Sequence, residues 1–404
     1  MKTFVGLAME PLKTFRLAAR RFGWVMILLI AAIPRHLDGQ SGVPKLPGDW
    51  DVGTPASVGI DDQVLTDVSH RAAGGEFGQV NSLLVARGGK LVFEEYYRGW
   101  GIHQIHTMQS ISKSVTSLLV GIAIGDGLIK SVDQRVSDFF PEYKAMFDQD
   151  PRKQRLTLRD VLTMTFGNDW KERAIPYSSP ANIVWRMAAA DDWMGFILGQ
   201  PMVEEPGSKF NYSTGSALLL SGILQHATGM HVSAYAEQHL FDPLGIPVDA
   251  WYRNMTHPQH WTHTGGGLGL RSRDLAKIGY LLVSGGRWNG KQVVPAAWIE
   301  ESTRARVQAD TALWYGYQWW LQSLPSSVGS AGAHNEVIEG RGYGGQFVVA
   351  VPRLDLVVAV TSGSFESEVE ARRALTMILQ HVLPAVKQLR STSQYERFST
   401  GKGR

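Results

Sequence analysis

Residues Met108 to Leu119 read M-Q-S-I-S-K-S-V-T-S-L-L and begin an apolar run with a helical period. The apolar positions that would share one helix face are Val115, Leu118, Leu119, Ile122 and Ala123. Ser110 and Lys113 are three residues apart, so in a helix their side chains would lie on one face of the first turn. The stretch therefore predicts an amphipathic helix that begins beside a serine and a lysine.

This pair has a chemical use. A serine hydroxyl is a poor nucleophile at neutral pH unless a base takes its proton. A lysine becomes such a base when burial or a neighbouring cation lowers its pKa. The spacing of Ser110 and Lys113 alone is weak evidence, because a serine at a helix start often caps the helix and a lysine there is often solvated.

The composition is that of a globular chain without the excess positive charge that nucleic-acid binding requires. Of 404 residues, 44% are hydrophobic and 19% are charged. The net charge is +3, and the excess lies in residues 1–36, so the remaining chain gives no reason to expect nucleic-acid binding. Because there is no cysteine, disulfides, thiolate metal sites and cysteine nucleophiles are excluded.

The N-terminus has the pattern of an export signal. Arg16, Arg20 and Arg21 precede the apolar run Gly23–Ile33, which is shorter than the about 20 residues of a membrane span. We expect residues 1–36 to be a signal peptide or an uncleaved N-terminal membrane anchor, so that the protein is exported to the periplasm or faces it. A wrongly assigned start is the alternative. Residues 37–56 are expected to be a linker and residues 387–404 a disordered basic tail.

Between these segments, 57–386 is predicted to be one domain. Two β-rich runs, Asn81–Arg87 and Leu91–Tyr97, are separated by Gly88-Gly89-Lys90, which indicates a hairpin. Helical patterns dominate about 128–262, and further strands, Phe347–Val351 and Leu356–Val360, precede a terminal helix. The fold class expected is α/β (α+β), with a sheet flanked by helices and a large helical insert.

Three further motifs contain residues that often occur in binding or catalytic sites. Tyr212 lies where a turn-rich segment meets an apolar helix, so it could point into a cleft or only pack there. His257, His260 and His263 are spaced three apart, but Pro258 and the lack of a carboxylate argue against a metal site. The glycines of 340–345 match G-x-G-x-x-G but lead into a strand, which argues against a nucleotide site and indicates backbone exposed on an edge strand.

Taken together, the serine–lysine pair, the Tyr-Ser turn about a hundred residues later and the Gly-rich strand near the C-terminus resemble the serine β-lactamase and penicillin-binding-protein superfamily. The likeness is greatest to class C β-lactamases, related esterases and 6-aminohexanoate-dimer hydrolases. It covers about 48–386 and implies an antiparallel sheet of the β-lactamase/transpeptidase type. Supporting phrases are Ser82–Val92, Arg271–Lys277, Arg287–Gln292 and Gly342–Gln346.

The resemblance implies roles for individual residues. Ser110 matches the nucleophile, Lys113 the activating lysine and Tyr212 the tyrosine of the Y-x-N element. The N–H groups of Ser110 and Gln346 would form the oxyanion hole, and Tyr343-Gly344-Gly345 would stand where the K-T-G element binds substrate. No metal or cofactor is implied.

Two departures shape the expected function. Thr214 stands where Y-x-N has Asn, and Tyr343 stands where the K-T-G lysine would bind a substrate carboxylate; Arg341 is a possible substitute. The expected protein is therefore a serine hydrolase that cleaves a small ester or amide through an acyl-enzyme. The alternatives are a true β-lactamase or D,D-peptidase, and a non-catalytic penicillin-recognising sensor.

Overall fold

The computed structural model describes residues 43–46, 48–247, 261–329 and 332–387. The predicted signal segment 1–36, the first part of the predicted linker and nearly all of the predicted tail lie outside these residues. Within the described ranges, no helix combines the length and the hydrophobicity that crossing a bilayer requires.

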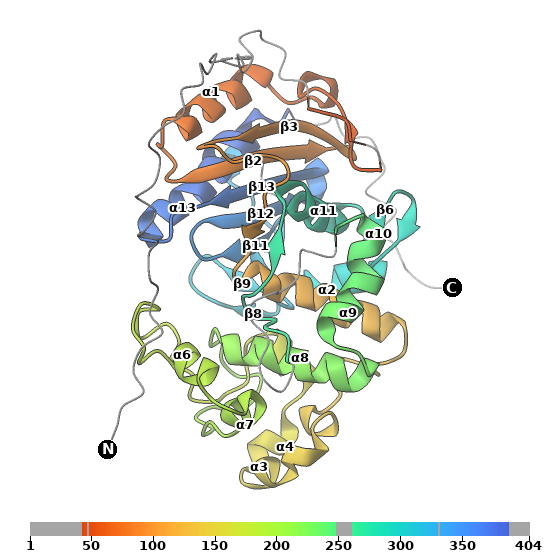
Figure 1. Cartoon of the computed structure of the whole chain (residues 1–404), viewed down its shortest axis with the longest axis vertical. Helices are drawn as coiled ribbons and strands as arrows, with labels where there is room; N and C mark the ends of the chain where they lie inside the picture. Colours follow the sequence, from red (N-terminus) through yellow and green to blue (C-terminus); the bar gives the residue numbers. More distant parts are fainter. Residues whose placement is uncertain (1–42, 47, 248–260, 330–331, 388–404) are drawn as a thin grey trace, which may run out of the picture. The chain divides into compact units, whose positions relative to one another are not determined.

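A nine-stranded sheet organises the described chain (Figure 1). Its neighbouring strands are antiparallel, apart from the parallel pair β1–β3, which confirms the predicted antiparallel sheet. In spatial order the strands are β1 (Asp51–Val52), β3 (Lys90–Tyr96), β2 (Val80–Arg87), β13 (Leu356–Ser362), β12 (Gln346–Val351), β11 (Val337–Gly342), β10 (Trp320–Gln322), β9 (Trp314–Tyr315) and β8 (Val307–Gln308).

The predicted hairpin is confirmed as β2 and β3. Its turn has Gly88 at φ 61° and Gly89 at φ 75°, the two positive values that a type I′ turn requires. Only glycine adopts such angles without steric cost, so the sequence Gly-Gly fixes the turn and, with it, the pairing of Arg87 with Lys90.

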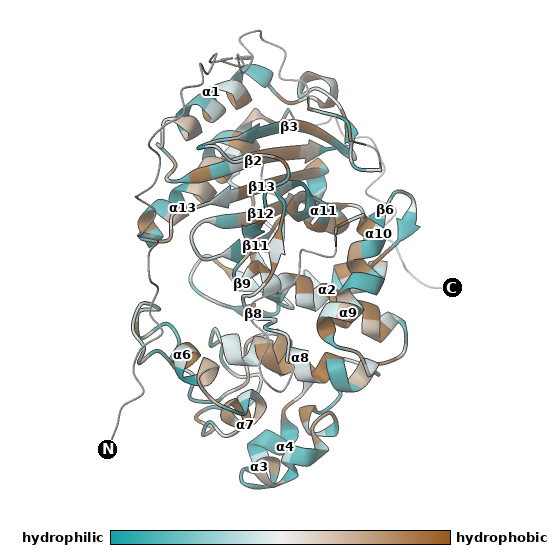
Figure 2. Ribbon diagram, viewed as in Figure 1, coloured by the Kyte–Doolittle hydropathy of each residue, from teal (hydrophilic) through white to brown (hydrophobic). Residues whose placement is uncertain are grey.

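Helices cover both faces of the sheet. Along β13, Val357 and Ala359 pack in the cluster that contains α2 (Ile111–Gly125) and α11 (Ser272–Val283). The alternate residues Val358 and Val360 pack in the cluster with α1 (Asp62–Ala73) and α13 (Glu368–Met377). Because successive strand residues point to opposite faces, a wholly apolar strand is suited to this three-layer arrangement. Hydrophobic residues accordingly gather on the central strands and α8, whereas α4 is mostly hydrophilic (Figure 2).

Helices α3 to α8 of the predicted helical insert lie below the sheet in Figure 1, and α8 packs against α2. Its helices are α3 (Lys144–Asp148), α4 (Pro151–Arg155), α5 (Leu158–Leu162), α6 (Ile183–Ala188), α7 (Trp193–Leu198), α8 (Thr214–Thr228), α9 (Val232–Ala236) and α10 (Asp242–Leu244). The short elements that follow are β5 (Gly269–Leu270), which pairs with β4 (His106–Thr107), the ribbon β6 (Arg287–Trp288) and β7 (Lys291–Gln292), and α12 (Ala296–Ser302). Helix α2 therefore lies between the sheet and the insert.

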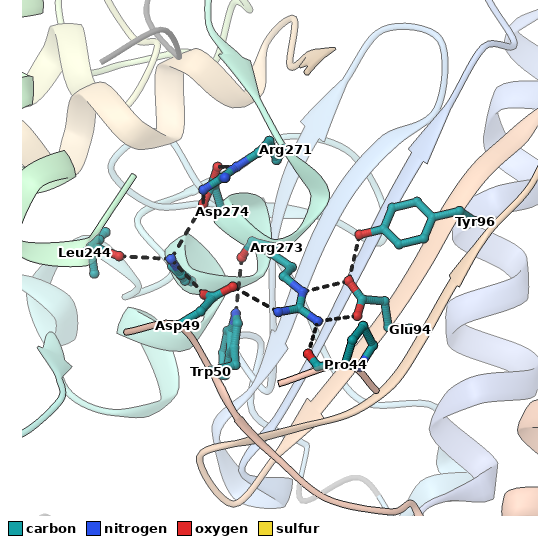
Figure 3. Close-up of polar contacts among 10 residues, drawn as sticks. Pro44, Asp49, Trp50, Glu94, Tyr96, Leu244, Arg271, Arg273 and Asp274 are labelled. Atoms are coloured by element: carbon teal, nitrogen blue, oxygen red, sulfur yellow. Dashed lines mark hydrogen bonds and ion pairs between the residues drawn. The ribbon is translucent and has the colours of Figure 1, made fainter. Parts of the chain in front are cut away.

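The prediction of a linker over residues 37–56 is wrong for the later, described part of that range. Trp50 is buried, and Asp51–Val52 forms β1 against β3. The reason is a buried ion network that holds this segment to α11 (Figure 3). Arg273, only 2% exposed, pairs with Asp49 at 3.0 Å and donates two hydrogen bonds to Glu94. The Pro and Gly content suggested a linker, but these long-range ion pairs decide the packing.

The same network neutralises its own charge. Lys277 pairs with Asp49 at 2.9 Å, and Arg271 binds Asp274 through two hydrogen bonds. With the Arg273 pairs, three cations face three carboxylates (Figure 3). Burial opposes ionisation of Asp49, but Lys277 and Arg273 outweigh it and lower the pKa of this carboxyl. Buried charges of this kind are tolerated because each is paired and hydrogen-bonded.

Candidate active site

Ser110 and Lys113 are in contact at the start of α2. The Nζ of Lys113 donates a hydrogen bond to the Ser110 Oγ at 3.0 Å and another to the carbonyl oxygen of Gly265. Lys113 is 1% exposed, and the Ser110 side chain makes no capping bond to the helix. The alternative of a capping serine beside a solvated lysine is therefore wrong, because both side chains turn toward each other instead.

The turn before Ser110 is held in an uncommon conformation. Gln109 has φ 50°, a value that residues with a Cβ seldom adopt and that often occurs at functional sites. The hydroxyl of Ser112 donates to the Gln109 carbonyl and accepts from the N–H of Leu268 at 3.1 Å. The adjoining Met108 N–H donates to the Leu268 carbonyl at 2.7 Å. These bonds fix the backbone that presents Ser110.

Tyr212 reaches the same place from a distant part of the chain. It lies just before α8, is 7% exposed and stacks on Trp320 with ring centres 5.8 Å apart. The Lys113 Nζ lies 5.1 Å from the centre of the Tyr212 ring. Ser110, Lys113 and Tyr212, which the sequence placed about a hundred residues apart, are thus brought together.

Glu172 is a site residue that the sequence reasoning missed. This carboxylate is 1% exposed and accepts hydrogen bonds from the Trp170 Nε1 at 2.8 Å and the Tyr177 hydroxyl at 2.6 Å. It also accepts from both the N–H and the hydroxyl of Thr214, the residue in the position of the family's Asn. A carboxylate at a helix N-terminus is electrostatically favoured, so Glu172 fixes the start of α8 and with it Tyr212.

His263 is buried near Lys113, whereas His257 and His260 fall outside the described residues. Burial, together with the neighbouring charge of Lys113, lowers the pKa of His263 to about 4. The imidazole is therefore neutral at pH 7, and its buried Nδ1 has no hydrogen-bond partner in the described part of the chain. No three His, Asp or Glu side chains within that part are grouped to hold a metal ion.

The Gly-rich segment forms the β11–β12 hairpin, and the prediction of an edge strand is wrong only for the part of β11 before Gly340, since Gly340–Gly342 pair with β12 but not with β10. β11 pairs with β12 along Ile338–Gly342 and with β10 along Val337–Glu339. The missed pairing comes from the short strands β8 to β10, of which β9 and β10 contain Trp or Tyr. Glycine is needed here for close packing, because a Cβ on Gly342 would come within 2.3 Å of the Met108 carbonyl oxygen. β11 therefore lies against the backbone that leads to Ser110.

Tyr343, Gly344 and Gly345 form the turn of this hairpin. Gly344 and Gly345 have φ 80° and 92°, which explains why both are glycine. The Tyr343 side chain is 41% exposed, and its hydroxyl donates to the Phe365 carbonyl at 2.7 Å. Its proposed part in substrate binding stays a prediction.

Gln346 and Arg341, which were also predicted to act in the site, form side-chain hydrogen bonds within the protein. The Gln346 side chain is 1% exposed and forms hydrogen bonds with both the carbonyl and the N–H of Ser362. The place of its N–H in an oxyanion hole stays a prediction. The Arg341 Nε donates to Glu339 at 2.5 Å, and its guanidinium lies 5.2 Å from the centre of the Trp320 ring. Arg341 is near the site, but its charge is matched by a buried carboxylate.

Comparison with known proteins agrees with this geometry. A model of the beta-lactamase family matches residues 75–383. A 6-aminohexanoate-dimer hydrolase of Paenarthrobacter ureafaciens is 26% identical over 303 residues, which cover 70% of this chain and 72% of the relative.

Solved structures with the same fold include two hydrolases. A putative 6-aminohexanoate-dimer hydrolase from Bacillus anthracis superposes with a TM-score of 0.64 at 18% identity, covering 86% of this chain and 89% of the other. A family VIII carboxylesterase superposes with a TM-score of 0.58 at 17% identity, covering 79% and 98% respectively.

Proposed function

This chain belongs to the beta-lactamase family and is a serine hydrolase, and we propose that it cleaves a small ester or amide through an acyl-enzyme on Ser110. The observation that carries the proposal is the contact between the Lys113 Nζ and the Ser110 Oγ. A distance of 3.0 Å is within the range for proton transfer between a nucleophile and its base.

The proposed reaction has two halves. Lys113, acting with Tyr212, takes the Ser110 proton while the Oγ forms a bond to the substrate carbonyl carbon. Collapse of the tetrahedral intermediate breaks the bond to the leaving group, which receives a proton from Tyr212. Water, deprotonated by the same pair, then attacks the acyl carbon. The bond to the Ser110 Oγ breaks, the Oγ takes back a proton from the pair, and the acid leaves.

The negative charge of each intermediate needs a binding site. We assign it to the N–H of Ser110 and an N–H of the β11–β12 hairpin, with Gln346 as the predicted donor. The close passage of Gly342 over Met108 supports this, because it brings the hairpin backbone to the residues before Ser110. Such a donor is worth about 10²–10³ in rate.

The preference for esters and small amides over β-lactams rests on the residues at the K-T-G position. Tyr343 carries no charge, and Arg341 is already bound to Glu339, so neither replaces the lysine that would bind a carboxylate there. The similar proteins named a 6-aminohexanoate-dimer hydrolase and a carboxylesterase support the same choice.

Replacing Ser110 with Ala tests the nucleophile. We expect Ser110→Ala to abolish turnover of 4-nitrophenyl butyrate and labelling by a fluorophosphonate, with unchanged circular dichroism. The matched control is Ser117→Ala in the same helix, because the Ser117 hydroxyl is buried without a hydrogen-bond partner in the described structure. Full activity of Ser110→Ala would remove this serine from the mechanism.

A sensor would behave differently. It would form a stable adduct with a penicillin or an ester and release no product, which mass spectrometry and a turnover assay together detect. Rapid hydrolysis of a chromogenic cephalosporin, without hydrolysis of butyrate esters or aminohexanoate amides, would favour a β-lactamase instead.

A further inference from the structure

A second cation lies on the aromatic side of the site. The guanidinium carbon of Arg173 is 4.4 Å from the centre of the Tyr212 ring and 5.3 Å from that of Trp320. These two rings are stacked on each other, and Arg173 itself is exposed. Arg173 is therefore both beside the tyrosine of the proposed mechanism and accessible from solvent.

The neighbouring charges leave Arg173 unmatched. Arg341 also lies against Trp320, but it is bound to the buried Glu339. Glu172 is next to Arg173 in the sequence, but its oxygens accept from neutral groups of Trp170, Tyr177 and Thr214 instead. Among the described residues, no carboxylate lies within ion-pair distance of Arg173.

Stacking accounts for where Arg173 lies but does not use its hydrogen-bonding capacity. A guanidinium that lies over an aromatic ring keeps its N–H donors at its edges, where they can bind a carboxylate through two parallel bonds. The ring contacts also restrict the side chain, so less conformational entropy is lost when a ligand binds. Arg173 is thus arranged as an anion-binding group in front of Tyr212.

Resting on the function proposed above, we propose that Arg173 binds a carboxylate carried by the leaving group of the substrate. Tyr212 hands a proton to that leaving group, so a charged group placed against Tyr212 faces the same half of the substrate. The substrate class is then an ester or amide whose departing alcohol or amine bears an anionic end. Arg173 would supply this cation from the Tyr212 side of the site, not from the K-T-G position, where Tyr343 carries no charge.

A pair of nearly isosteric esters tests this assignment. 3-Carboxyphenyl butyrate and 3-carbamoylphenyl butyrate differ in the charge of the leaving group, and the ratio of their kcat/KM values measures its recognition. We expect the parent protein to favour the carboxylate, and Arg173→Gln to lower the ratio about ten- to hundredfold, as expected for a charge-assisted hydrogen bond. Arg173→Lys should retain part of the preference.

Arg186→Gln is the matched control, because Arg186 is an exposed arginine 6.0 Å from the centre of the Phe196 ring, and we expect it to keep the parent ratio. An unchanged ratio in Arg173→Gln, or an equal loss for both esters, would overturn the assignment while leaving the nucleophile of the proposed function intact. Preference only for a carboxylate on the acyl half would also overturn it. Failure of the parent to hydrolyse either ester or to react with a fluorophosphonate would instead overturn the proposed function.

Discussion

The buried imidazole of His263 makes the folding stability of the protein depend on pH. Its pKa is lowered to about 4 by burial and by Lys113, whereas an unfolded histidine titrates near about 6.5. Between these values the unfolded chain binds the extra proton and the folded chain does not. Folding stability therefore falls as the pH is lowered from about 6.5 towards about 4, by on the order of 3 kcal/mol.

We expect His263→Gln to remove this contribution, measured as a smaller fall of the urea midpoint between pH 7.5 and 4.5. Part of the fall remains, since burial also lowers the pKa of His106 to about 4 and lowers that of His381. His103→Gln, at an exposed position, is the control and should follow the parent. If the urea midpoint of His263→Gln falls with pH as steeply as that of the parent, the imidazole is charged in the folded protein. Its burial then does not govern its titration.

At the scale of elements, the approach of β11 to the start of α2 depends on glycine. A Cβ at Gly342 would meet the Met108 carbonyl at 2.3 Å, so either the strand or the backbone before Ser110 has to move. We expect Gly342→Ala to cost about 1–3 kcal/mol of stability through overpacking, and to lower kcat for a nitrophenyl ester by more than tenfold.

Gly101→Ala is the matched substitution for this measurement. Gly101 has an ordinary φ, and an added Cβ there would have its nearest neighbour at 3.9 Å, so neither stability nor kcat should change. Unchanged kcat in Gly342→Ala would mean that the hairpin takes no part in placing the reacting groups.

At the scale of the whole molecule, the ion network ties residues before the first strand to α11 on the sheet. Arg273→Ala leaves Glu94 buried without its cation and Asp49 with Lys277 alone, which we expect to cost about 3–5 kcal/mol. Hydrogen exchange should rise over residues 43–52, because this segment loses its attachment. Chemical denaturation measures the first effect and mass spectrometry the second.

The exposed pair Arg372–Glu368 provides the control, since Arg372→Ala should cost about 1 kcal/mol or less. Equal losses in the two variants would show that the network contributes no more than a surface ion pair. Normal exchange over residues 43–52 in Arg273→Ala would show that Trp50 and β1 hold the segment by themselves.

What the sequence by itself determined is local. The hairpin β2–β3 follows from Gly88-Gly89, and α2 from its apolar period, because both depend on residues a few positions apart. The same holds for the Ser110–Lys113 contact, which one helical turn creates. The pairing of Arg341 with Glu339 could also have been predicted from the sequence, since residues two apart on a strand share a face.

The tertiary structure alone decided the contacts between distant segments. Tyr212 meets Lys113, and Glu172 binds Thr214, only because the insert folds back on α2. Spacing along the chain does not encode such an encounter; the family resemblance implied the place of Tyr212 but not that of Glu172. The packing of Trp50 and the interior place of β11 likewise depend on partners far away in sequence. Local geometry is set by backbone preferences within a few residues, whereas these contacts are selected by the burial and charge pairing of the whole fold.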